Sequence, residues 1–434
     1  MGAGANTGAG GCGGKQNPVI VDPDVAGGEV RCVRAFKNRG YSGSRMTFCT
    51  DGSQTGEFLD DEFSSFELDE GTVVKVCVDS DAEGECRSYY RSVPRVGGPF
   101  EDDISFIEIE HFNPEDFKMI FASDPQLFWS ECTAGFKEDC ANKGGDPKTI
   151  ALETNGNHVN AMNALGNVYG EQLVGLIVNG DLTAYGHDGE LSAFREFYEE
   201  KLEMNLWAGL GNHDYENNVD DCLENDCARN MLDYMGDYVE GYNAHSVDWS
   251  VSSGYDFPSN NKYHRGSLSY SWSIGGVRFV QLHNHPGYTV ELDSWHWSGA
   301  DRHHYTIEPS WSYLREELRE ANSRGERVVL NFHDRSGGFS ARGDDDSLTS
   351  VLRDLGQNVV AIMVGHLHPY IGQRGRMRNF GHRAVPVFFG GSALYQRFLL
   401  VGFKGDLMEV QVVDSRGGRA YELQEVDSYD ISLD

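Results

Sequence analysis

The stretch "LWAGLGNHDYEN", residues 206–217, runs from an apolar segment straight into charged and amide side chains. Its first half has the composition of a buried strand, and Asn212, His213 and Asp214 follow where such a strand would end. A single stop of this kind is usually a turn or a helix cap. The stretch decides the fold because the chain repeats its pattern several times.

Apolar strands alternate with amphipathic helices from about residue 118 onward. This alternation is typical of βα units around a largely buried sheet, where functional groups collect at the carboxyl ends of the strands. Strands are predicted at residues 117–123, 173–180, 206–212, 277–284, 327–334 and 359–366. Helices are predicted at residues 157–170, 191–204, 309–325 and 347–356.

Metal-binding side chains stand at five of these strand ends. A polar residue after a single strand is a weak signal, but five such strand ends in one domain, three of them with histidine, indicate a shared site. Carboxylate, amide oxygen and imidazole together suit two ions of Zn, Fe or Mn. Two cations about 3.5 to 4 Å apart can hold the attacking and leaving oxygens of a displacement at phosphorus and make hydroxide available at neutral pH. The candidates are Asp124, Gln126, Asp181, Asn212, His213, Asp214, His333, His366 and His368.

Five motifs occur in chain order: "SDPQ" (123–126), "GDLTAYG" (180–186), "GNHD" (211–214), the isolated His333 and "GHLH" (365–368). Together they resemble the calcineurin-like metallophosphoesterases. The resemblance implies that residues 117–428 form an α/β sandwich of two sheets flanked by helices. It also implies a dimetal-dependent hydrolase of phosphate esters with a metal-bridging hydroxide as nucleophile. Phosphodiesters are slightly favoured, because "GDLTAYGH" and "GNHD" look more like the phosphodiesterase-type branches.

The resemblance also implies a role for each residue. His213 would not be a ligand but would contact the phosphoryl oxygen and protonate the leaving group, with Asp214 orienting its ring. The implied ligands are Asp124, Gln126, Asp181 and His368 for one metal, and Asp181, Asn212, His333 and His366 for the other, with Asp181 bridging.

Gln126 departs from the usual pattern, which has histidine at this position. An amide oxygen is a weaker and harder ligand than imidazole, so the first metal site would be looser or would favour Mn or Fe over Zn. The alternative is that Gln126 hydrogen-bonds a metal-bound water. Some relatives resemble this chain in carrying glutamine there, so loss of activity does not follow.

Further substrate contacts are predicted at His283, Asn284 and His285, which follow another strand; the alternative for these is an ordinary surface loop. The segment 216–309 is interpreted as a long loop that shapes the substrate pocket or packs on the surface. Within it, "DDCLENDC" (220–227) is a predicted disulfide loop.

The segment 29–112 is predicted to be a small all-β domain, preceded by a flexible Gly-rich tail at residues 1–28. Phe36, Tyr41 and Gly43 in "FKNRGYSG" and the acids and hydroxyls of "DDEFSS" (60–65) resemble the βγ-crystallin domain, two Greek-key motifs that bind Ca²⁺. The second motif departs from it, with Cys77 and Ala82 where aromatic residues are usual. The alternative is a solvated acidic face. The candidate calcium ligands are Asp61, Ser64, Asp102 and Ser105.

Eight of the nine cysteines fall into close sequential pairs, which predicts four local disulfides and an oxidising compartment; the alternative is eight buried thiols. A secreted, cell-surface or periplasmic protein is expected, with no signal peptide in this chain. Cys12 is either a lipidation site in a longer precursor or a loose thiol. The pairs are 32/49, 77/86, 132/140 and 222/227.

The formal charge of −32 argues against binding to a nucleic-acid duplex, because phosphates would be repelled over most of the surface. No apolar run of about 18 residues is present, so no transmembrane segment is expected. The partner is a phosphoester substrate. The competing interpretation is a calcium-binding cell-surface or structural protein whose metal site is not catalytic.

Overall fold

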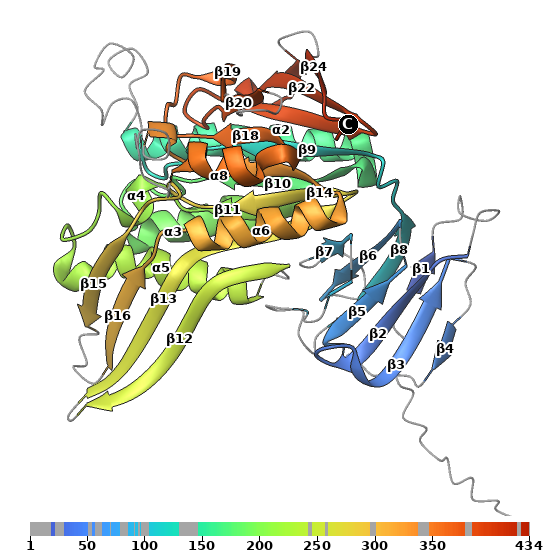
Figure 1. Cartoon of the computed structure of the whole chain (residues 1–434), viewed down its shortest axis with the longest axis horizontal. Helices are drawn as coiled ribbons and strands as arrows, with labels where there is room; N and C mark the ends of the chain where they lie inside the picture. Colours follow the sequence, from blue (N-terminus) through green and yellow to red (C-terminus); the bar gives the residue numbers. More distant parts are fainter. Residues whose placement is uncertain are drawn as a thin grey trace, which may run out of the picture. The chain divides into compact units, whose positions relative to one another are not determined.

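The structure is a computed structural model of the 434-residue chain. The described residues form two compact units, one ending at His111 and one beginning at Phe112 (Figure 1). Among them, no helix is long and apolar enough to cross a membrane. The structure describes residues 19–21, 30–50, 54–56, 63–69, 71–78, 86–90, 92–93, 96, 104–129, 146–241, 245–256, 259–295, 301–336, 347–377, 384–422 and 427–433.

The N-terminal unit contains two four-stranded sheets in its described part. Val33 and Phe66 from one sheet and Val74 and Ile109 from the other share a buried core, which confirms the predicted small all-β fold. The first sheet has the order β1 (Val19–Val21), β8 (Phe106–His111), β6 (Thr72–Cys77), β7 (Cys86–Tyr89). The second has the order β4 (Gln54–Gly56), β3 (Ser42–Cys49), β2 (Cys32–Asn38), β5 (Ser65–Leu68).

The segment predicted to be a tail is not all tail. Residues 19–21 form β1 and pair in parallel with β8, with Val19 opposite Ile107. The triplet "VIV" consists of β-branched residues, which favour strands. Because the surrounding sequence is rich in glycine, the whole segment was predicted to be a tail. Residues 1–18 and 22–29 lie outside the described residues.

Three of the four predicted disulfides lie among the described residues: Cys32–Cys49, Cys77–Cys86 and Cys222–Cys227. The first two join residues that face each other on paired strands, β2 with β3 and β6 with β7. The alternative of buried free thiols is therefore wrong for these six residues. The predicted pair 132/140 and residue 12 lie outside the described part.

The aromatic and glycine positions of residues 36–43 have a structural reason. The rings of Phe36 and Tyr41 meet edge to face with centroids 6.0 Å apart. Gly43 has φ +84°, and a Cβ there would lie 2.7 Å from Asn38 Nδ2. Only glycine fits this turn without moving the neighbouring side chain.

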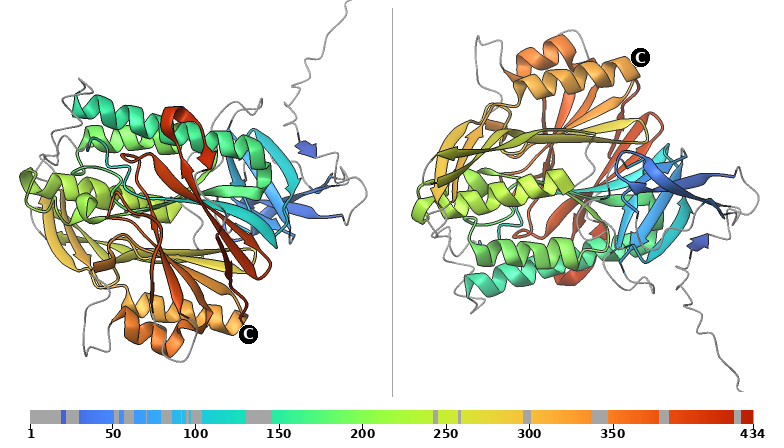
Figure 2. Two further views of the ribbon diagram at one scale, coloured as in Figure 1. Left: turned by 90° about the horizontal axis from the view of Figure 1, so that it is seen from above. Right: turned by 90° about the horizontal axis from the view of Figure 1, so that it is seen from below.

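The larger unit contains two sheets, each carrying helices on its outer face. In Figure 2 the green helices α2 (Pro147–Tyr169) and α3 (Asp188–Arg195) and the orange helices α6 (Trp311–Arg324) and α8 (Leu348–Leu355) lie on opposite sides of the strands. Leu314 and Leu318 of α6 and Val351 of α8 pack into a buried cluster with residues of β14 (Val277–Gln281), β17 (Arg327–Asn331), β18 (Val359–Val364) and β20 (Val385–Gly390). The predicted sandwich of two sheets flanked by helices is confirmed.

The strand orders of the two sheets, as far as they are described, are as follows. The seven-stranded sheet runs β11 (Asn205–Gly209), β10 (Leu173–Asn179), β9 (Asp116–Ala122), β21 (Arg397–Lys404), β22 (Leu407–Asp414), β23 (Tyr421–Glu422), with β24 (Asp427–Asp430) also on β22. The nine-stranded sheet runs β15 (Val290–Trp295), β16 (Asp301–Ile307), β13 (Ser259–Ile274), β14 (Val277–Gln281), β17 (Arg327–Asn331), β18 (Val359–Val364), β20 (Val385–Gly390), β19 (Ile371–Met377), with β12 (Ser246–Asp256) on β13.

The segment 216–309 is not a loop. It forms helix α5 (Asp226–Gly241) and the strands β12, β13, β15 and β16 in addition to β14. β12 and β13 are rich in serine, and they pair with each other along most of their length. Apolar residues alternate with polar ones in both strands, from Val247 to Val251 in β12 and from Leu268 to Ile274 in β13, so the strand pattern is present in the sequence and the interpretation as a loop overlooked it.

His158 of α2 makes the stability of the larger unit depend on pH. Its side chain is 1% exposed, its Nδ1 lies 2.8 Å from Ser415 Oγ, and burial lowers its pKa to about 3. Below the pH at which an unfolded histidine titrates, about 6.5, the unfolded state binds a proton that the folded state does not. The stability contributed at neutral pH is therefore lost as the pH falls from about 6.5 toward 3.

We expect His158→Gln to remove this dependence. Between pH 7 and pH 5 the wild type should lose about 2 kcal/mol more free energy of unfolding than the variant, because each pH unit below 6.5 costs about 1.4 kcal/mol. Urea unfolding at the two pH values measures the difference. Equal losses in the two proteins would show that His158 is not held neutral.

Candidate functional site

Loops from both sheets converge at the carboxyl ends of five strands. β9, β10 and β11 are parallel neighbours in one sheet, and β17 and β18 are parallel neighbours in the other. The two sets of strand ends lie close together: His333 Nδ1, just after β17, is 2.7 Å from the backbone oxygen of Asn179 at the end of β10. Parallel strands present their carboxyl ends at one edge, so the polar residues that follow them share one site.

Asp181 lies at the centre of this site and is fully buried. Its Oδ2 is 3.1 Å from His333 Nε2 and accepts a hydrogen bond from Gln126 Nε2, also at 3.1 Å. Its Oδ1 accepts a hydrogen bond from the backbone N–H of His213 at 2.9 Å. One carboxylate thus contacts residues from three other loops.

Asn212 joins two histidines on one side of Asp181. Its Oδ1 lies 3.0 Å from His333 Nε2 and 2.9 Å from His366 Nδ1. One donor atom each of Asp181, His333 and His366 falls within 4.8 Å of the others, which is close enough for a single metal ion.

Asp124 and His368 lie on the other side. His368 Nε2 is 3.3 Å from Asp124 Oδ1, and Asp124 Oδ2 accepts a hydrogen bond from the backbone N–H of His366 at 3.2 Å. Donor atoms of Asp124, Asp181 and His368 again fall within 4.8 Å of one another. The two groups share Asp181, and they bring together the residues that the sequence assigned to two metals.

The buried carboxylates of the site favour the binding of cations. The buried Asp124 Oδ1 has no well-directed hydrogen bond among the described residues, and its nearest polar neighbours are the ring nitrogens of His368 at 3.3 Å and His333 at 3.9 Å. Burial alone would lower the pKa of His333, but the carboxylates of Asp181 and Asp124 outweigh it and raise that pKa to about 10. The negative charge of these two buried carboxylates is not balanced by the surrounding side chains, and it stabilises a proton on the neighbouring imidazole instead. Divalent ions would supply the missing positive charge.

The backbone is strained at the same residues. Asp124, Gln126, Asp181 and His366 have φ of 53°, 38°, 53° and 72°, in the left-handed region that non-glycine residues seldom adopt. Such strain costs about 1–3 kcal/mol per residue and clusters at functional sites. Gly211 is required here as well, because a Cβ on it would lie 2.3 Å from Asp181 Oδ1.

His213 is held beside the carboxylates without joining either group. Its Nδ1 lies 2.8 Å from the backbone oxygen of Ala184, so Nδ1 carries a hydrogen and donates it. The rings of Trp129 and Tyr185 pack against the imidazole with centroids 5.1 Å and 5.8 Å away. Sequence reasoning assigned no role to these three neighbours, because a backbone carbonyl has no sequence signal, Trp129 matches no motif, and Tyr185, although it lies within "GDLTAYG", was not assigned to His213.

Asp214 does not orient the His213 ring. Its carboxylate accepts hydrogen bonds from the backbone N–H groups of Gly211, Leu182 and Thr183 at 2.8, 3.1 and 3.0 Å. Burial raises the pKa of Asp214 to about 7, with the charge of Asp181 adding to the effect. The predicted role of Asp214 is therefore corrected: it ties the loop after β10 to the short helix α4 (Asn212–Tyr215).

The three predicted substrate residues after β14 differ in their surroundings. His283 is 1% exposed; its Nδ1 accepts a hydrogen bond from Leu210 N–H and its Nε2 donates one to Leu268 O, so no ring nitrogen is left for a substrate. Both interpretations of His283, as a substrate contact and as a residue of a surface loop, are therefore corrected. Asn284 donates to the Glu216 carboxylate. His285 is half-buried, and together with Asn284 it stays a prediction.

The predicted calcium sites fall partly outside the described residues, which include neither Asp61 nor Asp102. Ser64 is buried, and its N–H donates to the backbone oxygen of Phe36 in β2. The N–H of Ser105 donates to the backbone oxygen of Cys77 in β6. Calcium binding at these positions stays a prediction.

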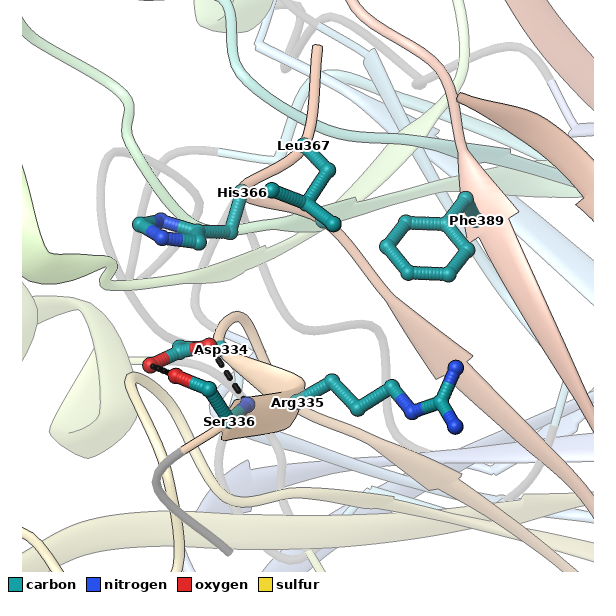
Figure 3. A pocket seen from close by; sticks show the side chains of 7 residues that line it. Asp334, Arg335, Ser336, His366, Leu367 and Phe389 are labelled. Carbon is teal, nitrogen blue, oxygen red and sulfur yellow. Dashed lines mark hydrogen bonds between the residues drawn. The ribbon is translucent and has the colours of Figure 1, made fainter. Parts of the chain in front are cut away.

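A pocket of about 270 Å³ adjoins His366. Leu367 and Phe389 lie across it from Arg335 (Figure 3). Its wall thus combines these two apolar side chains with polar groups, including the guanidinium of Arg335 and the carboxylate of Asp334. The lining residues are Asp334, Arg335, Ser336, Gly365, His366, Leu367 and Phe389.

The family model of the calcineurin-like phosphoesterases matches residues 117–370. The chain belongs to this family. Calcineurin-like phosphoesterases hydrolyse phosphoesters with the help of divalent metal ions, and the Asp124 and Asp181 groups described above are suited to hold them. A comparison with curated proteins found no match.

Solved structures similar to each unit were also found. Calcineurin-like phosphoesterase YfkN from Bacillus subtilis is 11% identical, covering 73% of this chain and 91% of that chain with a TM-score of 0.30. Vacuolar Protein Sorting 29 from Cryptosporidium parvum is 10% identical, covering 73% and 98% with a TM-score of 0.26. A mutant βγ-crystallin domain from Clostridium beijerinckii is 19% identical, covering 18% of this chain and 99% of that chain with a TM-score of 0.16.

Gln126 is the position where this phosphoesterase differs from the motif expected for its family. Its side chain is 3% exposed and points its amide at Asp181. We expect Gln126→His to tighten binding of the more weakly held metal by about tenfold, or ~1.4 kcal/mol, because imidazole is the better donor to Zn, Fe or Mn. Chelator-competition titrations measure this, with Gln126→Ala as the matched control. Equal affinities in the wild type and Gln126→His would contradict a ligand position at residue 126.

Proposed function

We propose that the chain is a phosphodiesterase that uses two metals, each Mn, Fe or Zn. The observation that carries the proposal is the fully buried Asp181, which belongs to two groups of metal-binding side chains and also fixes the backbone of His213. The proposed ligands are Asp124, Gln126, Asp181, Asn212, His333, His366 and His368, and the proposed general acid is His213.

The chemistry follows from the arrangement of these side chains. When bound, the two cations would polarise the phosphoryl oxygens and lower the pKa of a water molecule between them. His213 donates through Nδ1 to Ala184 O, so its Nε2 is the atom that delivers a proton to the leaving oxygen. The rings of Trp129 and Tyr185 restrict the rotation of the imidazole and keep Nε2 in place.

The pocket beside His366 supports the preference for diesters. A monoester presents only one substituent, whereas a diester presents a second one that needs a binding surface. Leu367 and Phe389 offer apolar contact for this second substituent, and Arg335 offers charge to the phosphate or a polar group on it.

Substrate comparison tests the proposal. With Mn²⁺, kcat/KM should be higher for a bis-aryl phosphate than for the matching aryl phosphate. Phe389→Ala should raise KM for the diester by about tenfold, because loss of pocket contacts costs about 1–3 kcal/mol, and should change the monoester little. A wild type that prefers the monoester, with Phe389→Ala equally active on both, would refute the diester assignment.

We further propose the domain division and the location of the protein. The units are a βγ-crystallin-like domain predicted at 29–112 with Ca²⁺ between its loops, to whose first sheet β1 of the predicted tail at 1–28 adds a strand, and the phosphoesterase domain at 117–428. The disulfides among the described residues support an oxidising compartment, hence a secreted, cell-surface or periplasmic protein. Calcium titration of the whole chain by calorimetry tests the calcium site.

A further inference from the structure

A second cluster of metal-binding side chains lies outside the family centre, where α5 packs beside β13. One donor atom each of Asp233, His264 and His303 falls within 4.8 Å of the other two. Asp233 belongs to α5, His264 to β13 and His303 to β16. None of the three residues takes part in the proposed phosphoesterase chemistry.

Strand register brings these side chains to one face. β13 and β16 pair in parallel with His264 opposite Tyr305, and His303 is two residues before Tyr305. Because residues opposite one another and residues two apart point to the same face of a sheet, all three rings lie on one side. Tyr305 donates a hydrogen bond to Asp233 Oδ1 at 2.6 Å, so this side faces α5.

The distances match a tetrahedral ion. His264 Nε2 lies 3.2 Å from His303 Nδ1, which in turn lies 3.8 Å from Asp233 Oδ1. Donors at about 2.0–2.1 Å from a tetrahedral zinc are about 3.3 Å apart. We propose that Asp233, His264 and His303 form a separate Zn²⁺-type site that fastens α5 to the β13–β16 pair, with water as the fourth ligand.

The surroundings suit such a site. The hydroxyl of Tyr305 supports the Asp233 carboxylate in the way that ligating carboxylates are usually supported, and Arg229 lies 3.9 Å from the other oxygen, Oδ2. His264 is buried, whereas the Asp233 side chain is 36% exposed and leaves a route for the ion. Two imidazoles and one carboxylate favour Zn²⁺ over Mg²⁺ or Ca²⁺.

Metal content of the full chain tests the proposal. After saturation with Zn²⁺ and gel filtration, the wild type should hold one zinc ion more per chain than Asp233→Asn or His264→Gln. With Co²⁺, the wild type minus Asp233→Asn difference spectrum should show the intense visible absorption of tetrahedral cobalt. Because the family centre is unchanged in these variants, it cancels in both comparisons.

His304→Gln is the matched control, because His304 neighbours His303 but lies near Asp293 and stacks on Tyr263. It should retain the wild-type zinc content. If His264→Gln fails to fold, Asp233→Asn decides, since an amide oxygen still accepts the hydrogen bond from Tyr305. Equal zinc content in the wild type and Asp233→Asn, with a featureless difference spectrum, would leave only a hydrogen-bonded cluster of His264, His303, Tyr305 and Asp233 and overturn the proposal.

Discussion

Asp181→Asn is expected to abolish phosphoester hydrolysis, with a loss on the order of 10³-fold or more, comparable with removal of one member of a tightly coupled catalytic unit. The carboxylate belongs to both groups of metal-binding side chains, and an amide cannot supply its charge to either. Elemental analysis should show that the variant holds more than one metal ion fewer per chain than the wild type.

The Asp181→Asn variant should still fold, because the introduced amide keeps an oxygen for the His213 N–H and removes one of the buried carboxylates that repel one another. Asp116→Asn is the matched control, since Asp116 lies at the opposite end of the same sheet, at the start of β9. It should keep wild-type metal content and rate. Two tightly bound metals and normal turnover in Asp181→Asn would show that Asp181 does not bridge them.

His213→Ala is expected to lower kcat by about 10²–10⁴-fold while metal content stays unchanged, as loss of a general acid predicts. The effect should depend on the leaving group. Alkoxides need a proton as they depart, so alkyl esters should lose most of their rate, whereas nitrophenyl esters should lose little. Rates across a series of leaving groups of increasing pKa measure this.

His245→Ala serves as the control, because His245 pairs with Glu320 on α6 and is neither a proposed ligand nor a neighbour of His213. A uniform loss across the series in His213→Ala would assign His213 to phosphate binding instead of proton donation. A loss of metal in that variant would assign it to the metal ligands.

The strands that carry the site could be predicted from the sequence because they are buried on both faces. β18 is apolar throughout and β10 has no polar side chain before its last residue, Asn179, so the polar residues that follow, Asp181 and His366, are visible as interruptions. The strands β12 and β13 instead alternate apolar residues with serine and other polar residues, and this pattern was overlooked when their segment was interpreted as a loop. Their partners are mostly neighbours in the chain, since β12 pairs with β13 and β13 pairs with β14.

The error about Asp214 has a geometric cause. Asp214 directly follows His213 in the sequence, but on a helical turn consecutive side chains point in different directions. The Asp214 carboxylate faces the loop after β10, and the backbone oxygen of Ala184 takes its expected place at His213 Nδ1. The left-handed backbone of Asp124 and Asp181 likewise could be seen only in the structure.

The central claim is that residues from five strand ends form a metal-dependent phosphoesterase centre around Asp181. Its most direct test is the hydrolysis of bis-aryl phosphate by the wild-type protein before metal removal, after exhaustive chelation and after Mn²⁺ is restored. Activity that disappears on chelation and returns with two Mn²⁺ ions per chain is the predicted result. Hydrolysis that persists in metal-free protein, or that is absent with both ions bound, would contradict it.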